Sequence, residues 1–297
     1  MKKLIILAFY IGSQGFTKQA MAWPGGLRSS SSFFRGLFGP ELKVASFGDS
    51  VASGFNSSFW LKKVEGGTYA DHFGSWYNQS YDYSVRVRNI AAAGFTLEQI
   101  FNSLINRNAN RIREADLIFL EGGGNNFLDL NHKKYIDLCK PENFYPTLEK
   151  AKSDFFSMMN DVQRYKKPTS RVRVLGIYYP LMNESRTRAC VLKSLAPSVH
   201  VSFTNALADF NWFLASESKR RGFTYVDTFS RLNCTQKNWS ACKPTNYKSL
   251  SSYKNKLIEL DRLGILRDPG DLGWLQKDRI HPNIYGHSLI SWAIRNP

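Results

Sequence analysis

Short apolar runs alternate with longer amphipathic segments through most of this chain, and this alternation limits the folds open to it. The short runs have the length of buried strands and cover residues 42–48, 83–91, 116–121, 172–179 and 225–229. The longer segments carry apolar residues at helical spacing and cover residues 96–112, 147–166, 202–221 and 285–295. Strands separated by helices in this way run parallel, with helices on both faces of the sheet. We therefore expect an α/β fold with about five parallel strands and a ligand site beyond their carboxyl ends.

The first 22 residues have the features of a bacterial secretory signal. Positive charge at Lys2 and Lys3 precedes an apolar stretch at 4–11, and the small residues needed for cleavage end at Ala22. A membrane anchor is the alternative, but this stretch is too short to span a bilayer, and the mature chain has no apolar segment of transmembrane length. We expect cleavage after Ala22 and export to the periplasm or the medium.

The mature chain is strongly basic. The formal net charge is +16 for the whole sequence and +13 once the three lysines of residues 1–22 are removed. A charge of this size favours an anionic partner, such as a component of the cell envelope. Lysine and arginine are scattered and no nucleic-acid-binding motif is present, so specific binding of nucleic acid is not expected. We expect a monomer with an N-terminal extension at 23–40 and one domain at 41–297.

Four cysteines lie in three long connections between the expected elements, at 127–146, 181–200 and 230–277. An even number of cysteines in an exported chain favours two disulfides, and three pairings are possible. The short interval between Cys234 and Cys242 favours that local bridge, which leaves Cys139 to pair with Cys190. No CxxC pair or nearby histidine accompanies them, so we expect no metal site.

A serine follows the first expected strand at a sharp turn. The run ends in Gly48, Asp49 and Ser50, which places the Ser50 hydroxyl at the carboxyl edge of the sheet. Gly-Asp-Ser alone is a common turn, and the G-x-S-x-G nucleophile elbow is not matched because Ala52 occupies its last glycine position. Ser50 is therefore a candidate nucleophile that needs support from other residues.

Two further turns with glycine and asparagine follow the next strands. Gly94 closes the second strand, where a backbone N–H could point at a developing oxyanion. Three glycines at 122–124 and then Asn125 follow the third strand, and the asparagine amide is a further hydrogen-bond donor. For Gly94 the alternative is an ordinary strand-to-helix glycine. For residues 122–124 the alternative is a phosphate-binding loop, but no Gly-Lys-Ser/Thr follows.

Near the C-terminus, Asp278 precedes His281 by three residues. A carboxylate at this spacing can reach the Nδ1 of the histidine within one loop, which leaves Nε2 to accept a proton from a serine. Such spacing also arises by chance, so the pair gains weight only from the serine and the two turns.

Together these elements resemble the SGNH/GDSL hydrolase superfamily. Ser50 matches its nucleophile block, Gly94 its oxyanion glycine and Asn125 its asparagine, while Asp278 and His281 match its Asp-x-x-His block. The order of the blocks also agrees, over a span from residue 42 to the C-terminus. The resemblance implies a three-layer α/β/α sandwich with a flavodoxin-like parallel sheet.

The resemblance also implies a mechanism. Ser50 attacks an ester carbonyl, His281 accepts the serine proton, and Asp278 orients His281. The backbone N–H groups of Ser50 and Gly94 and the amide of Asn125 form the oxyanion hole. No metal or organic cofactor is implied.

Two positions depart from the family pattern. Asn126 replaces the aspartate that usually follows the oxyanion asparagine, and Val51 replaces the leucine that usually follows the serine. The first departure removes a charge beside the site and bears on the positioning of Asn125.

The substrate is less determined than the reaction. Basic charge and export favour an acyl ester of an anionic envelope component, and we expect O-acetyl groups on peptidoglycan or another polysaccharide. The alternatives are a lysophospholipase or other lipid acyl hydrolase, and a glycan-binding protein without turnover. Substrate contacts are not assigned, but five aromatic residues could stack on sugars or line an acyl pocket: Phe55, Phe59, Trp60, Phe127 and Trp274.

Overall fold

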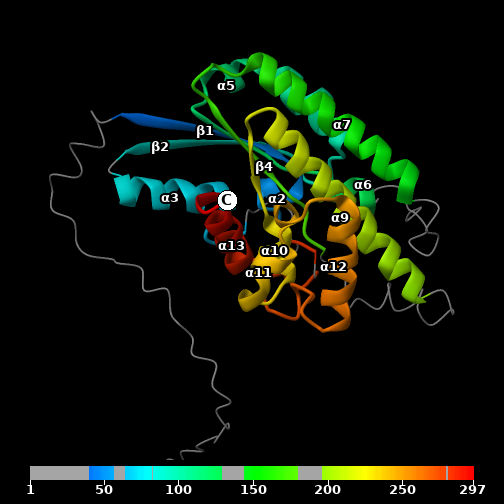
Figure 1. Ribbon diagram of the computed structural model, residues 1–297. Helices are drawn as coiled ribbons and strands as arrows, with labels where there is room; N and C mark the ends of the chain where they lie inside the picture. The colour runs from blue at the N-terminus through cyan, green and yellow to red at the C-terminus, as the bar shows by residue number, and fades with distance from the viewer. Residues whose placement is uncertain (1–39, 57–63, 82, 129–143, 180–195, 279) are drawn as a thin grey trace, which may run out of the picture.

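The computed structural model describes residues 40–56, 64–81, 83–128, 144–179, 196–278 and 280–297. Five parallel strands form one sheet in the order β2-β1-β3-β4-β5 (Figure 1). The strands are β1 (Glu41–Gly48), β2 (Ser84–Ala91), β3 (Leu117–Leu120), β4 (Arg171–Leu175) and β5 (Thr224–Val226). This is the flavodoxin-like strand order, in which the chain changes direction across the sheet between β1 and β3.

Helices cover both faces of the sheet, which makes a three-layer α/β/α sandwich. Figure 1 shows α7 and α9 on one side of the strands and α3 and α13 on the other. The long helices are α3 (Tyr69–Tyr81), α7 (Phe144–Tyr165), α9 (Ala196–Arg220), α12 (Leu250–Arg262) and α13 (Ile284–Arg295). A composite helical segment follows β2 and consists of α4 (Leu97–Gln99), a π-helical stretch (Ile100–Ile105), a 3-10 turn (Asn106–Asn108) and α5 (Ala109–Glu114). Short helical pieces complete the chain: α2 (Ser50–Ser53), α6 (Gly124–Leu128), α10 (Thr228–Asn233), α11 (Trp239–Cys242) and 3-10 turns at Gln236–Asn238 and Pro244–Asn246.

The central strands of the sheet bury side chains on both faces. In β3, Ile118 packs with the layer of α7 and α9, whereas its neighbour Phe119 packs with the layer of α3 and α13. Both side chains are fully buried. A strand that is covered on both faces has no side chains facing water. This explains why such strands appear in the sequence as continuous apolar runs.

The expected strands and the four expected helices are present, with shifts of a few residues at their ends. Two features differ from expectation. Helix α3 was not expected, and the connection 230–277, expected as a loop, contains α11, α12 and most of α10. The strand expected to end at residue 229 stops at Val226, because Asp227 caps α10 by accepting a hydrogen bond from Ser230 N.

Cys234 and Cys242 form the expected disulfide, which joins the end of α10 to α11. Cys139 and Cys190 lie outside the described residues, as do the signal segment, the extension up to residue 39 and most of the connections 127–146 and 181–200. Among the helices that are described, none combines the length and the apolarity needed to cross a membrane.

Candidate active site

Ser50 lies directly after β1 at the first residue of α2, and it is buried. Asp49 caps this short helix, because its Oδ1 accepts a hydrogen bond of 2.9 Å from Val51 N. The hydroxyl of Ser53 donates to the Ser50 carbonyl at 3.0 Å, which closes the turn. The nucleophile candidate is thus held in a turn whose geometry is fixed on both sides.

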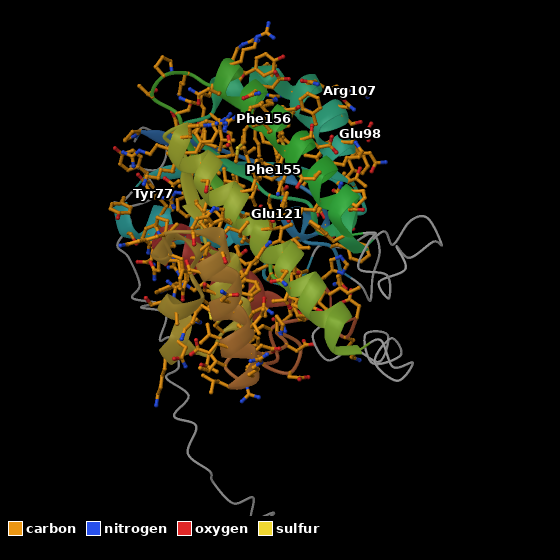
Figure 2. All side chains as sticks on the ribbon, turned by 45° about the vertical axis from the view of Figure 1, so that its right-hand side comes forward. Tyr77, Glu98, Arg107, Glu121, Phe155 and Phe156 are labelled. Atoms are coloured by element: carbon orange, nitrogen blue, oxygen red, sulfur yellow. A yellow bond between two sulfur atoms is a disulfide. The ribbon has the colours of Figure 1, made fainter. Side chains whose placement is uncertain are left out.

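Glu121, the residue after β3, supports the same turn through hydrogen bonds to its backbone. Its Oε2 accepts hydrogen bonds from the backbone N–H groups of Asp49 at 3.2 Å and Ala52 at 3.3 Å. A Cβ at Gly48 would lie 2.5 Å from this oxygen, so only glycine leaves room for the carboxyl group. Figure 2 shows Glu121 inside the fold, and it is buried. Sequence reasoning placed Glu121 at the end of a strand and gave it no role.

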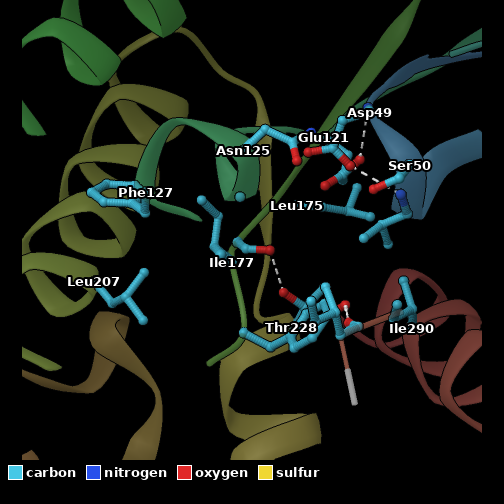
Figure 3. Close-up of a pocket in the computed structure, with 15 residues that line it drawn as sticks. Asp49, Ser50, Glu121, Asn125, Phe127, Leu175, Ile177, Leu207, Thr228 and Ile290 are labelled. Atoms are coloured by element: carbon cyan, nitrogen blue, oxygen red, sulfur yellow. Dashed lines mark hydrogen bonds between the residues drawn. The ribbon is translucent and has the colours of Figure 1, made fainter. Parts of the chain in front are cut away.

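Asp49 and Glu121 form a buried carboxyl pair beside Ser50 (Figure 3). Burial raises the pKa of Glu121 well above its ordinary value, and the negative charge of Asp49 raises it further. Burial also raises the pKa of Asp49, although hydrogen bonds from Val51 N and Glu121 and the charge of His281 oppose this rise. In the described part of the chain, no lysine or arginine forms an ion pair with either carboxyl. Two buried carboxyl groups this close do not readily carry two negative charges, so the raised pKa of Glu121 favours its neutral form.

Gly94 and Asn125 come together beside this turn. Gly94 has a φ of 80°, a backbone conformation that glycine adopts without strain. Asn125 is the second residue of α6 and is buried. Its Nδ2 donates a hydrogen bond of 2.9 Å to the carbonyl of Phe95, the residue after Gly94. An amide nitrogen has two hydrogens, so a second donor is available for a substrate oxygen.

Asn126, the departure from the family pattern, has a defined partner. Its Oδ1 accepts a hydrogen bond of 2.9 Å from Leu97 N, at the first residue of α4. An amide oxygen and a carboxylate oxygen both accept such a bond. The neutral side chain therefore ties the turn after β3 to the segment after Gly94, and the missing charge does not leave the turn unsupported.

Asp278 and His281 form the expected pair. His281 Nδ1 lies 2.5 Å from Asp278 Oδ2, and Oδ1 of the same carboxylate accepts from the backbone N–H groups of Ile280 at 3.0 Å and His281 at 3.1 Å. Burial raises the pKa of Asp278, but the hydrogen bonds from His281 and Ile280 outweigh it and leave the pKa below its ordinary value. Asp278 is thus an anion at neutral pH, and it fixes both the ring and the backbone of His281.

The loop that carries His281 packs against the nucleophile turn. The ring of Phe55 lies 4.7 Å from that of His281, and Phe55 N donates to the Ser50 carbonyl at 3.0 Å. Gln276 connects the same elements, since its Nε2 donates to the Phe55 carbonyl at 2.7 Å. Within the described residues, Ser50 Oγ and His281 form no hydrogen bond. Such bonds are often long without substrate and shorten in the complex.

Tyr178, just beyond β4, holds the histidine loop from its other side. Its hydroxyl donates a hydrogen bond of 2.6 Å to the carbonyl of Ile280. The side chain is buried. The sequence gives no sign of this role, because a tyrosine within an apolar run is typical of a core residue. Only the packing of β4 against the C-terminal loop brings these residues together.

A small cavity of about 40 Å³ lies beside Ser50 at this edge of the sheet (Figure 3). Ser50 and Asn125 contribute polar groups to its wall, and Phe127, one of the five aromatic candidates, contributes an apolar ring. Phe55 packs on His281 and Trp274 is half-buried, whereas Phe59 and Trp60 lie outside the described residues. Among the residues that are described, no group of three or more His, Cys, Asp or Glu side chains is placed to hold a metal ion.

Comparisons with known proteins identify the family of this chain and solved structures with a similar fold. The profile of the GDSL-like lipase/acylhydrolase family matches residues 44–294, so the chain belongs to this family and is a carboxylic ester hydrolase. Similar solved structures include the lipase Lip_vut3 from a goat rumen metagenome, with 16% identity and a TM-score of 0.56 over 86% of this chain and 96% of that one. The acetylxylan esterase Axe2 from Geobacillus stearothermophilus has 14% identity and a TM-score of 0.51 over 86% and 93%. A search of curated proteins found no match.

Proposed function

We propose that this protein is an exported serine esterase that removes O-acetyl groups from peptidoglycan or another polysaccharide of the cell envelope. The observation that carries the proposal is the packing of the Asp278–His281 loop against the turn of Ser50. A nucleophile, a base with its orienting carboxylate and oxyanion donors then occupy one edge of one sheet, where ligands of such folds bind.

In the first half of the reaction, Ser50 Oγ attacks the ester carbonyl while His281 Nε2 takes its proton. Asp278 holds the ring through Nδ1 and stabilises the imidazolium. The oxyanion receives hydrogen bonds from the N–H groups of Ser50 and Gly94 and from the Asn125 amide. Collapse of this intermediate breaks the ester bond, and His281 returns the proton to the departing sugar hydroxyl.

In the second half, water attacks the acetyl-serine. His281 takes a proton from the water, the same donors stabilise the second oxyanion, and the bond to Ser50 Oγ breaks as the proton returns to it. The products are the deacetylated glycan and acetate. No group beyond these side chains and water is used in either half.

The choice of substrate and location rests on charge and on the N-terminal segment. A formal charge of +13 after removal of residues 1–22 favours an anionic polymer over a neutral one. The acetylxylan esterase among the similar structures acts, by its name, on an acetylated polysaccharide, but at 14% identity it supports the fold alone. Export is checked by producing the full chain in a bacterium and sequencing the N-terminus of the periplasmic or secreted product, which should begin at Trp23.

The reaction is tested with p-nitrophenyl acetate and with O-acetylated peptidoglycan, by measuring nitrophenol and acetate. Ser50→Ala should lower kcat by at least about 10³-fold on both substrates. Ser157→Ala is a matched control, because Ser157 is half-buried on α7 and its hydroxyl donates to Ser153 O. Equal hydrolysis by Ser50→Ala and the control would contradict the mechanism. Fatty-acid release from lysophospholipids in place of acetate would move the substrate to lipids, and tight glycan binding without turnover would favour the binding protein.

A further inference from the structure

The cavity beside Ser50 has both polar and apolar walls. Ser50 and Asn125 line it at the carboxyl edge of the sheet, where the carbonyl of an ester would meet the oxyanion donors. The side chains of Ile177, Leu207 and Phe127 line it further in (Figure 3). A group that enters with its carbonyl at Asn125 therefore directs its alkyl part toward these three apolar side chains.

The volume of the cavity limits what this alkyl part can be. At about 40 Å³ the cavity is small and has room for only a few water-sized groups. An acetyl group has three non-hydrogen atoms, whereas a butyryl group adds two methylenes and a fatty acyl chain many more. We propose that this cavity is the acyl-binding site, and that Leu207, Ile177 and Phe127 restrict the acyl group to acetyl. The inference rests on the esterase function proposed above and names the residues that select its acyl group.

The walls of the cavity are held by contacts that oppose widening. Asn211, on α9, fixes the backbone of Ile177 on both sides: its Oδ1 accepts from Ile177 N at 2.8 Å and its Nδ2 donates to Ile177 O at 2.9 Å. The ring of Phe127 packs edge-on against Phe210, with centroids 5.6 Å apart. Leu207 lies on the same helix as Asn211 and Phe210 and is buried. Close packing of this kind cannot yield to a longer chain without moving α9.

The acyl-chain preference of the purified enzyme tests the proposal with p-nitrophenyl acetate, butyrate and octanoate. For the native chain, kcat/KM should fall at least about tenfold from acetate to butyrate and further to octanoate. Leu207→Ala enlarges the cavity and should raise the butyrate-to-acetate ratio about tenfold. Leu214→Ala is the matched control, since Leu214 is also buried on α9 but does not line the cavity, and its ratio should equal that of the native chain.

The smaller change Leu207→Val serves if Leu207→Ala does not fold, and it should shift the ratio in the same direction. Hydrolysis of octanoate by the native enzyme as fast as acetate would overturn the acyl-site proposal and leave the esterase function standing. The acyl-site proposal would also be overturned if the Leu207 variants shift the butyrate-to-acetate ratio no more than Leu214→Ala does. Absence of hydrolysis of every ester by the native enzyme would overturn the esterase function itself, and the acyl site with it.

Discussion

The hydroxyl of Tyr178 donates a hydrogen bond of 2.6 Å to the carbonyl of Ile280, the residue before His281. The segment that carries Tyr178 lies beyond the end of β4, where no strand of the described residues pairs with it. Two asparagine side chains supply the backbone hydrogen bonds that a neighbouring strand would provide. Asn211 bonds both the N–H and the carbonyl of Ile177, and Asn233 does the same for Tyr179 at 2.8 Å each. Tyr178 is thus fixed between two clamped residues and can hold the histidine loop in place.

Removal of the Tyr178 hydroxyl should affect turnover more than substrate binding. In Tyr178→Phe, kcat should fall about tenfold because the loop of His281 loses an anchor, while KM stays close to that of the native enzyme. The free energy of unfolding should fall by about 1 kcal/mol for the lost hydrogen bond. Steady-state kinetics and urea denaturation measure the two effects.

Tyr253→Phe is the matched control for this change. Tyr253 is fully buried on α12, and its hydroxyl has no hydrogen-bond partner among the described residues. Its loss should leave kcat unchanged. If both variants keep the native kcat, Tyr178 supports the fold and does not position His281.

Glu121 should be replaceable by glutamine but not by alanine. Burial and the neighbouring Asp49 raise the pKa of Glu121 and so favour its neutral form. A glutamine can accept the bonds from Asp49 N and Ala52 N through its amide oxygen while its NH₂ faces the Asp49 carboxylate. Glu121→Gln should keep kcat within about threefold. Glu121→Ala removes the support of the Ser50 turn and should lower kcat by about 10- to 100-fold.

The two Glu121 variants are compared by kcat, KM and thermal unfolding at pH 7. A native-like unfolding temperature for Glu121→Gln shows that the turn is intact. If this variant nevertheless loses as much activity as Glu121→Ala, the charge of an ionised Glu121 is needed, and the neutral form is not the active one.

His287 should make the fold sensitive to acid. It is buried between α13 and α3, and burial, with the charges of His72 and His281, lowers its pKa to about 3. An unfolded histidine has a pKa of about 6.5. Between these values the unfolded chain binds a proton that the folded chain excludes, so the free energy of unfolding falls as the pH falls from about 6.5 toward 3.

His287→Phe removes this titration. Urea denaturation at several pH values between 4 and 7 should give a slope of unfolding free energy against pH that is smaller than the native slope by up to about 1.4 kcal/mol per unit. The comparison uses slopes, so a general loss of stability in the variant does not affect it. Identical slopes would mean that His287 becomes protonated in the folded protein or that other groups dominate the acid response.

The pattern of residues along the chain was enough to predict the sheet and the order of the site elements. Apolar runs such as 116–121 could be recognised because parallel strands covered on both faces lack polar positions. Ser50, Gly94 and Asn125 follow successive strands, and parallel strands bring their carboxyl ends to one edge. The spacing of Asp278 and His281 also sufficed to predict their contact, since it is local. The connection 230–277 was harder to interpret, because its helices α10 and α11 are too short to establish a period.

Tertiary structure alone decided how these residues are supported and what fits beside them. Glu121 reaches the turn after β1, and Tyr178 reaches the loop at Ile280, across 102 residues of sequence. No local pattern marks either contact, because each depends on which strands are neighbours and on the register between them. The acyl cavity has the same origin: its volume is set by the packing of Leu207 on α9 against the strand ends, and side chains from distant segments determine it together.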